Sequence, residues 1–169
     1  GQIVEEGFRA TLTEEGSRHP VTAALPGSET SPPSWGRWFR LIEAAQTSGR
    51  AVMEGPEGRP LMVLDTVGEG RVAQLLSDHA WLWARGFEGG GPQAEMLRRL
   101  AHWLMKEPDL EEERLLATGN DGSLTIERRT MASEADQVTV TLPSGTTETL
   151  TLSETAPGRF TGSIATEEI

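Results

Sequence analysis

Residues 60 to 108 read PLMVLDTVGEGRVAQLLSDHAWLWARGFEGGGPQAEMLRRLAHWLMKEP, and this stretch decides the fold. Two apolar runs flank Gly68-Glu69-Gly70, whose glycines allow the positive φ angles of a tight hairpin. An aromatic turn, a glycine run and an amphipathic segment then follow in order. This order predicts two strands and a helix, arranged as in the closing half of an α/β domain.

The amphipathic segment predicts a helix from about residue 92 to residue 106. A proline at position 92 fits the first helical turn, and Pro108 ends the helix because it lacks a backbone donor. The apolar residues recur with the spacing of one core-facing stripe. The predicted stripe consists of Met96, Leu97, Leu100, Trp103 and Leu104.

The sequence before this block predicts less. Residues 1 to 34 contain repeated breakers, so we expect little regular structure there. Residues 35 to 46 follow Ser34 as a possible N-cap and space their apolar residues like a short helix or turn. Short apolar runs at 51–53 and 61–64 are typical of buried strands.

The sequence after residue 108 has a different character. Segments at 123–129, 137–142, 147–153 and 159–164 alternate apolar and polar residues, with turn signals between them. This pattern predicts an all-β, immunoglobulin-like sandwich, of which four or five strands are expected against roughly seven in a complete domain. We therefore expect an α/β domain over residues 1–108, a linker over 109–116 and a truncated β-rich segment over 117–169.

Composition supports that division and excludes several functions. Residues 1–107 contain 14 acidic and 11 basic side chains and all five tryptophans, whereas residues 108–169 contain 12 acidic and 4 basic side chains. An acidic chain without a dense basic cluster lacks what phosphate-backbone binding requires, so nucleic acid is not an expected partner. No cysteine is present for a disulfide or a thiolate site, and no apolar run approaches the roughly 20 residues of a membrane span.

His79 is the one candidate catalytic residue. It follows the second strand of the predicted hairpin, and strand ends deliver side chains to the edge of a sheet where α/β proteins place their sites. A general base there needs a nucleophile and an orienting carboxylate within hydrogen-bond reach. Asp78 is more simply a capping residue, and a structural role for His79 is the competing interpretation.

The candidate binding residues are Trp81, Trp83, Phe87 and Gly90, which could form an aromatic wall beside a glycine run. Packing over the sheet edge is the simpler interpretation of the aromatic residues. The glycines before a helix also suggest an anion cradle, but the chain lacks the GxGxxG spacing and the Lys-Ser/Thr pair of phosphate-binding loops. His19, His79 and His102 form no paired metal motif, so neither a metal nor another cofactor is expected.

The block from Gly68 to Pro108 resembles the C-terminal half of class I glutamine amidotransferase-like domains. The likeness covers about residues 1 to 108 and includes the segments HPVT at 19–22 and WGRWFR at 35–40. It is closest to the version in large bacterial inner-membrane proteins that carry an aerotolerance-type membrane region and a von Willebrand factor A-like segment. The resemblance implies a partial flavodoxin-like domain followed by an immunoglobulin-like segment, in the soluble and periplasmic part of such a protein.

The same family places a catalytic cysteine on a nucleophile elbow, and a histidine followed two residues later by glutamate. His79 resembles that histidine by position, but Trp81 stands where the glutamate would be and the chain has no cysteine. The expected function is therefore a noncatalytic protein-interaction or assembly module, with other proteins or the parent's remaining domains as partners. The alternative is an amidotransferase- or hydrolase-class enzyme, with His79 as base and a nucleophile in the missing N-terminal half. A third possibility, polysaccharide binding by the β-rich segment, is disfavoured because that segment has neither Trp nor Tyr.

Overall fold

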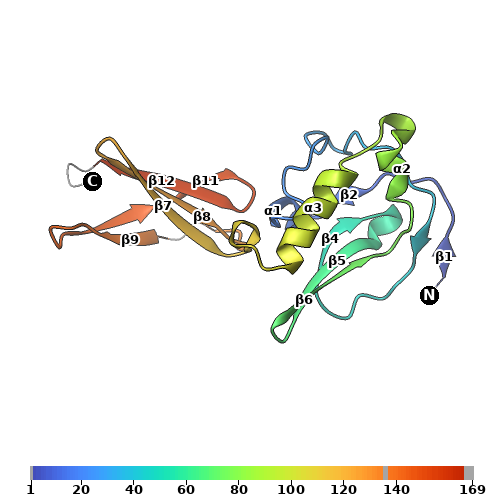
Figure 1. Cartoon of the computed structure of the whole chain (residues 1–169), viewed down its shortest axis with the longest axis horizontal. Coiled ribbons are helices and arrows are strands. Elements are labelled where there is room, and N and C mark those ends of the chain that lie inside the picture. The colour runs from blue at the N-terminus through green and yellow to red at the C-terminus, as the bar shows by residue number, and fades with distance from the viewer. Residues whose placement is uncertain (1, 135–136, 166–169) are drawn as a thin grey trace. The chain divides into compact units, whose positions relative to one another are not determined.

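The computed structural model describes residues 2–134 and 137–165, and it is rich in β-sheet with few helices (Figure 1). The chain divides into two compact units between Glu111 and Glu112, hereafter unit 1 and unit 2. Within the described ranges, no helix is long and apolar enough to cross a membrane. The elements of unit 1 are β1 (Ile3–Val4), β2 (Thr11–Leu12), α1 (Glu14–Arg18), β3 (Leu41–Ile42), β4 (Arg50–Glu54), η1 (Pro56–Gly58), β5 (Pro60–Val67), β6 (Gly70–Leu75), α2 (Trp81–Ala84), η2 (Phe87–Gly89), α3 (Gln93–Leu104) and η3 (Pro108–Leu110).

The main sheet of unit 1 has the strand order β2-β4-β5-β6, and every pairing in it is antiparallel. The predicted hairpin is confirmed, because Val67 pairs with Gly70 and leaves Gly68 and Glu69 as a two-residue turn. Gly68 has φ of 59°, the positive value that favours glycine in such turns. β1 and β3 form a separate antiparallel pair.

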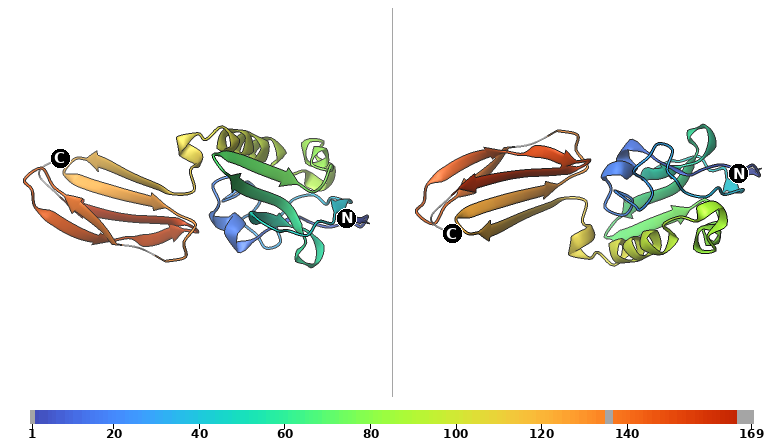
Figure 2. Two further views of the ribbon diagram at one scale, coloured as in Figure 1. Left: turned by 90° about the horizontal axis from the view of Figure 1, so that it is seen from below. Right: turned by 90° about the horizontal axis from the view of Figure 1, so that it is seen from above.

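The predicted helix is also confirmed, as α3, which lies along one side of the sheet (Figures 1 and 2). Met96 and Trp103 are fully buried in the core of unit 1. Arg71 of β6 ties the strand to the end of α3, because its Nη1 donates to the Trp103 carbonyl at 2.6 Å. The same guanidinium lies 5.0 Å from the Trp103 ring centroid and pairs with Glu111 at 2.6 Å.

The predicted core-facing stripe of α3 includes two residues that the structure leaves exposed. Leu97 and Leu104 have exposed fractions of 41% and 40%. Each follows a fully buried residue by one position, which turns it by about 100° around the helix axis and away from the sheet. Of the predicted stripe, only Met96, Leu100 and Trp103 pack into the core of unit 1.

The prediction of a short helix or turn over residues 35–46 was wrong. Trp38 instead pairs with Phe8 in an antiparallel bridge, and β3 follows at Leu41–Ile42. The backbone N–H of Trp38 donates to the Phe8 carbonyl and that of Ile42 donates to the Leu76 carbonyl. The hydrogen bonds of this segment thus go to distant parts of the chain, which the spacing of its apolar residues does not reveal.

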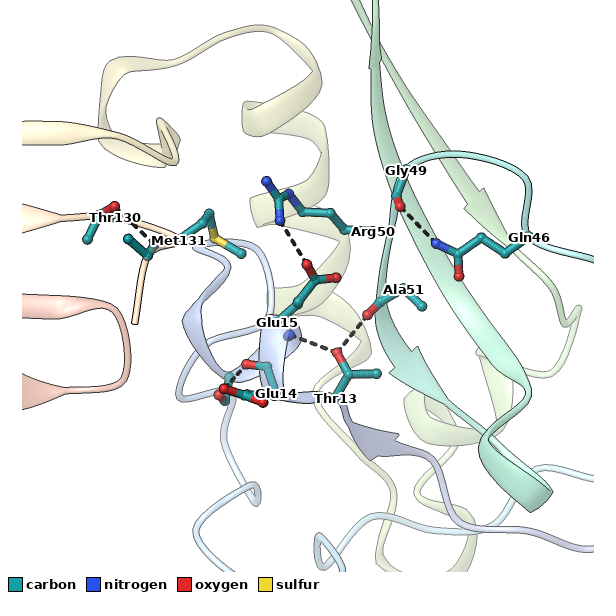
Figure 3. A network of polar contacts seen from close by, with 12 residues as sticks. Thr13, Glu14, Glu15, Gln46, Gly49, Arg50, Ala51, Thr130 and Met131 are labelled. Atoms are coloured by element: carbon teal, nitrogen blue, oxygen red, sulfur yellow. Dashed lines mark hydrogen bonds and ion pairs between the residues drawn. The ribbon is translucent and has the colours of Figure 1, made fainter. Parts of the chain in front are cut away.

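The N-terminal segment contributes more to the core than its breakers predict. Thr13 caps α1: its Oγ1 accepts from the Gly16 N–H at 2.8 Å and donates to the Ala51 carbonyl at 2.6 Å (Figure 3). A side chain at position 16 would lie 1.8 Å from the Val52 carbonyl oxygen, so glycine permits α1 to touch β4. His19, predicted as a loop residue, is fully buried with its ring edge against Trp103.

Unit 2 consists of two antiparallel sheets, ordered β11-β12-β8-β7 and β10-β9. Its buried core residues include Ile126, Leu152 and Phe160, and Val138, Val140 and Leu150 of the two-stranded sheet pack against them. The four predicted alternating segments all contain strands, whereas β7 and β11 were missed because both are largely exposed and show little alternation of burial. The strands are β7 (Arg114–Asn120), β8 (Ser123–Arg129), β9 (Gln137–Thr141), β10 (Thr147–Thr151), β11 (Ser153–Ala156) and β12 (Arg159–Ala165).

Candidate functional site

The candidate site is built where residues 38–42 run beside the segment that follows β6. The Ile42 N–H donates to the Leu76 carbonyl at 2.8 Å, and Ser77 Oγ donates to the Arg40 carbonyl at 2.6 Å. The Ser77 Oγ also accepts from the His79 N–H at 3.1 Å. These bonds replace a regular strand ladder and bring His79 against Phe39.

The imidazole of His79 is held by the backbone. Its Nδ1 accepts the N–H of Phe39 at 3.0 Å, so the neutral ring carries its proton on Nε2. Nε2 lies 3.8 Å from an oxygen of Asp78, beyond hydrogen-bond distance. Asp78 instead pairs with Arg40 at 3.0 Å. With Nδ1 engaged and Nε2 protonated, the ring in this arrangement offers no free lone pair for a general base.

Trp81 and Trp83, grouped as one candidate wall, lie in different environments. Trp81 has an exposed fraction of 53% and sets its ring at 6.4 Å from that of His79. Trp83 has an exposed fraction of 3% and donates its Nε1–H to the Gly36 carbonyl at 2.7 Å. Two residues on a helix lie about 200° apart, which explains why one ring faces solvent and the other faces the core.

Trp83 is the centre of an aromatic core. Its ring centroid lies 4.6 Å from that of Trp38 and 5.2 Å from that of Trp35, in tilted arrangements. All three rings are buried. Trp83 is thus a packing residue, and the simpler of the two sequence interpretations fits its geometry.

The glycine run wraps around Trp83. The Gly90 carbonyl accepts from the Gly36 N–H at 2.7 Å, and the Gly90 N–H donates to the Phe87 carbonyl at 2.8 Å. A Cβ atom on Gly91 would lie 2.4 Å from the Trp83 ring. The glycines thus allow a close approach of backbone to indole, and the Gly90 donor is already used within the chain rather than offered to an anion.

Phe87 forms part of the surface together with residues that the sequence did not single out. Its exposed fraction is 39%, and its ring lies 5.7 Å from that of Phe39 in an edge-on arrangement. The Arg37 guanidinium lies 5.4 Å from the centroid of Phe39. The sequence did not predict Arg37 and Phe39 as site residues. They lie in the segment for which a helix was expected, and in a helix neither side chain would reach the glycine run.

Arg37 also forms an ion pair with Glu88. Its Nη2 lies 2.5 Å from Glu88 Oε1, its Nε lies 3.0 Å from Oε2, and its backbone N–H donates to Oε2 at 3.2 Å. The hydrogen bonds from Arg37 lower the pKa of Glu88 to about 2, and Glu88 in turn raises the pKa of Arg37. The pair joins the segment around residue 37 to η2 across 51 positions of sequence.

We call this set the aromatic surface: Arg37, Phe39, His79, Trp81, Phe87 and Glu88. It combines exposed aromatic rings with an arginine and a carboxylate, all held by bonds between two distant segments. Tryptophan, phenylalanine and arginine are enriched in protein interfaces, where rings that are already positioned lose little entropy on binding. Nowhere in the described residues do His, Asp or Glu side chains gather as a metal site.

A hollow of about 210 Å³ in unit 1 lies elsewhere. It lies between loop residues 44–48 and one face of the β5–β6 hairpin. The polar pair within it is Ser48 and Asp65, whose oxygens lie 2.6 Å apart. It contains none of the predicted site residues, and its lining has no histidine or lysine that could act with Ser48 and Asp65 as a catalytic triad does.

Comparison of the chain with protein-family models, curated proteins and solved structures gives no match. The functional assignment therefore rests on the geometry of the aromatic surface.

Proposed function

We propose that this chain is a noncatalytic protein-interaction or assembly module, which binds a partner protein, or another domain of a longer parent, through the aromatic surface. Trp81 and Phe87 are the anchoring side chains, because they combine large apolar area with substantial exposure. Arg37 and Glu88 provide a charged border, which in interfaces contributes to orientation and association rate more than to affinity.

The observation that carries the proposal is the hydrogen bond from the Phe39 N–H to His79 Nδ1. Through this bond His79 connects two segments that are distant in the sequence. Because Nδ1 accepts the bond and Nε2 carries the proton, neither ring nitrogen has a free lone pair for base catalysis. The alternative expected from the sequence, an amidotransferase- or hydrolase-class enzyme with His79 as base, gains no support from this geometry. A cysteine nucleophile, as amidotransferases use, would also have to come from outside this chain, which contains no cysteine.

The wider setting of the proposal is a membrane-anchored bacterial protein, with this part on the periplasmic side. In that setting unit 1 is the closing part of an amidotransferase-like, partly flavodoxin-like domain, and unit 2 is an immunoglobulin-like segment. The order of hairpin, aromatic turn and α3 supports the first assignment, and the two facing sheets of unit 2 support the second. The parallel strands of a flavodoxin-like sheet would then belong to another part of the domain, since the sheet described in unit 1 is antiparallel.

Site-specific photo-crosslinking tests the binding surface directly. A benzophenone side chain placed at Trp81 should give one discrete protein adduct in cells that produce the chain. The same group at Val67, also on unit 1 and with an exposed fraction of 62%, is the matched control. Equal labelling from both positions, or none from position 81, would count against the aromatic surface.

A paired substitution tests the noncatalytic role. Asparagine at position 79 places an amide oxygen near the site of Nδ1 and can still accept the Phe39 N–H, whereas alanine cannot. We expect no hydrolysis of glutamine or simple amides above background by the wild-type chain or by either variant. Turnover that disappears in both His79→Asn and His79→Ala, while both remain folded, would establish the enzyme instead.

A further inference from the structure

One exposed flank of α3 carries an apolar stripe that the core does not use. It consists of four exposed residues, the outer stripe: Ala94, Leu97, Ala101 and Leu104. Met105, with an exposed fraction of 63%, extends it at the helix end. An amphipathic helix on a protein surface normally shows solvent a polar face, so a second, exposed apolar line about 100° around the helix from the core-facing line is the exception to explain.

The outer stripe has the spacing of a coiled-coil seam. Its residues are separated by three, four and three positions, which is the a and d pattern of a heptad. Small and large residues alternate along it. In an antiparallel pair, Ala94 meets Leu104 of the second copy and Leu97 meets Ala101 of the second copy. Every layer then packs a small residue against a large one, and the stripe is complementary to itself, as a two-fold interface requires.

The charges around the outer stripe permit this approach. Arg98 is the charged residue next to the seam on one side, and Glu95 of the same helix neutralises it through two hydrogen bonds of 2.8 Å. On the other side the seam is flanked by Gln93 and Leu100, which are uncharged. Along α3 itself, two copies that meet on this line therefore bring no unpaired like charges together.

We propose that the outer stripe is a self-association surface, on which a second copy of this chain docks its own α3 in antiparallel orientation. α3 has 12 residues and is therefore about 18 Å long. A single pair of such helices buries less than the roughly 1,200 Å² of a stable interface, so the dimer is weak. The proposal does not depend on the aromatic surface.

Sedimentation equilibrium of the whole chain over about 10 to 500 µM, a range that brackets a weak interface, tests this self-association. We expect a monomer–dimer equilibrium that Leu97→Glu weakens at least about tenfold, because the carboxylate would lie in an apolar layer. Leu104→Glu should act in the same way. Leu116→Glu is the matched control, since Leu116 lies in β7 with a similar exposed fraction of 43%. A monomer throughout the range, or equal weakening by the control, would overturn the proposal.

Cysteine cross-linking then tests the orientation, because the chain has no cysteine of its own. A mixture of Ala94→Cys and Leu104→Cys proteins should form a disulfide-linked dimer on mild oxidation. Ala94→Cys alone should not, since ten positions along the helix separate the two cysteines by about 15 Å in an antiparallel pair. Cross-linking by Ala94→Cys alone would instead indicate parallel pairing and would refute the antiparallel arrangement.

Discussion

Replacement of Trp83 by phenylalanine tests whether this ring is core or binding site. The substitution removes the Nε1–H that donates to the Gly36 carbonyl at 2.7 Å within the core. A buried acceptor left without its donor costs about 1 to 3 kcal/mol. The lost part of the indole removes roughly 40 Å² of buried apolar area, which adds about 1 kcal/mol.

We therefore expect Trp83→Phe to lower the free energy of unfolding of unit 1 by about 2 to 4 kcal/mol. For a unit of this size, that change lowers Tm by roughly 10 to 20 °C. Trp81→Phe is the matched control, two residues away with an exposed fraction of 53%, and it should change stability by less than about 0.5 kcal/mol.

Urea unfolding followed by far-UV circular dichroism measures both variants without relying on tryptophan emission. The two units can unfold in separate transitions. The loss of the α3 amide signals in NMR spectra identifies the transition of unit 1, and Trp83→Phe should shift that transition. Equal stability changes in the two variants would refute the division between a buried Trp83 and an exposed Trp81.

Three further changes test other parts of unit 1. Gly91→Ala should destabilise unit 1 by at least about 1 kcal/mol in urea, because its Cβ would lie 2.4 Å from the Trp83 ring; no loss would contradict the close packing. Thr13→Ala should cost about 1 kcal/mol in the same assay, whereas Thr13→Ser keeps the hydroxyl cap of α1 and should cost clearly less. Glu88 and Glu95 have folded pKa values lowered to about 2, so the stability that they contribute is present above pH 4.5 and is lost as pH falls toward 2. The double variant Glu88→Gln/Glu95→Gln should flatten the pH dependence of Tm in that window, and an unchanged slope would show that these ion pairs contribute nothing there.

Several features of this protein follow from the sequence by itself. The hairpin of β5 and β6 depends on Gly68 in a two-residue turn, and α3 depends on a helical repeat between Pro92 and Pro108. The four alternating segments of unit 2 likewise became strands. These signals are local, because about ten consecutive residues are enough to determine the turn type and the period of the apolar residues.

Other features were decided only by tertiary structure. The segment from Trp38 to Ile42 bonds to chain on both of its sides, so its helix-like spacing did not determine its conformation. The position of His79 in the sequence suggested a general base, but its Nδ1 accepts a hydrogen bond from a backbone N–H forty residues away.

The same holds for which apolar side chains are buried. The sequence marks Trp81 and Trp83 as similar, and it places Leu97 in the same stripe as Met96. Burial is a property of what lies opposite a side chain, and a one-residue step on a helix turns a side chain by about 100°. Trp83 and Met96 point into the core of unit 1, whereas Trp81 and Leu97 are exposed, and those exposed residues are the ones on which both proposed surfaces depend.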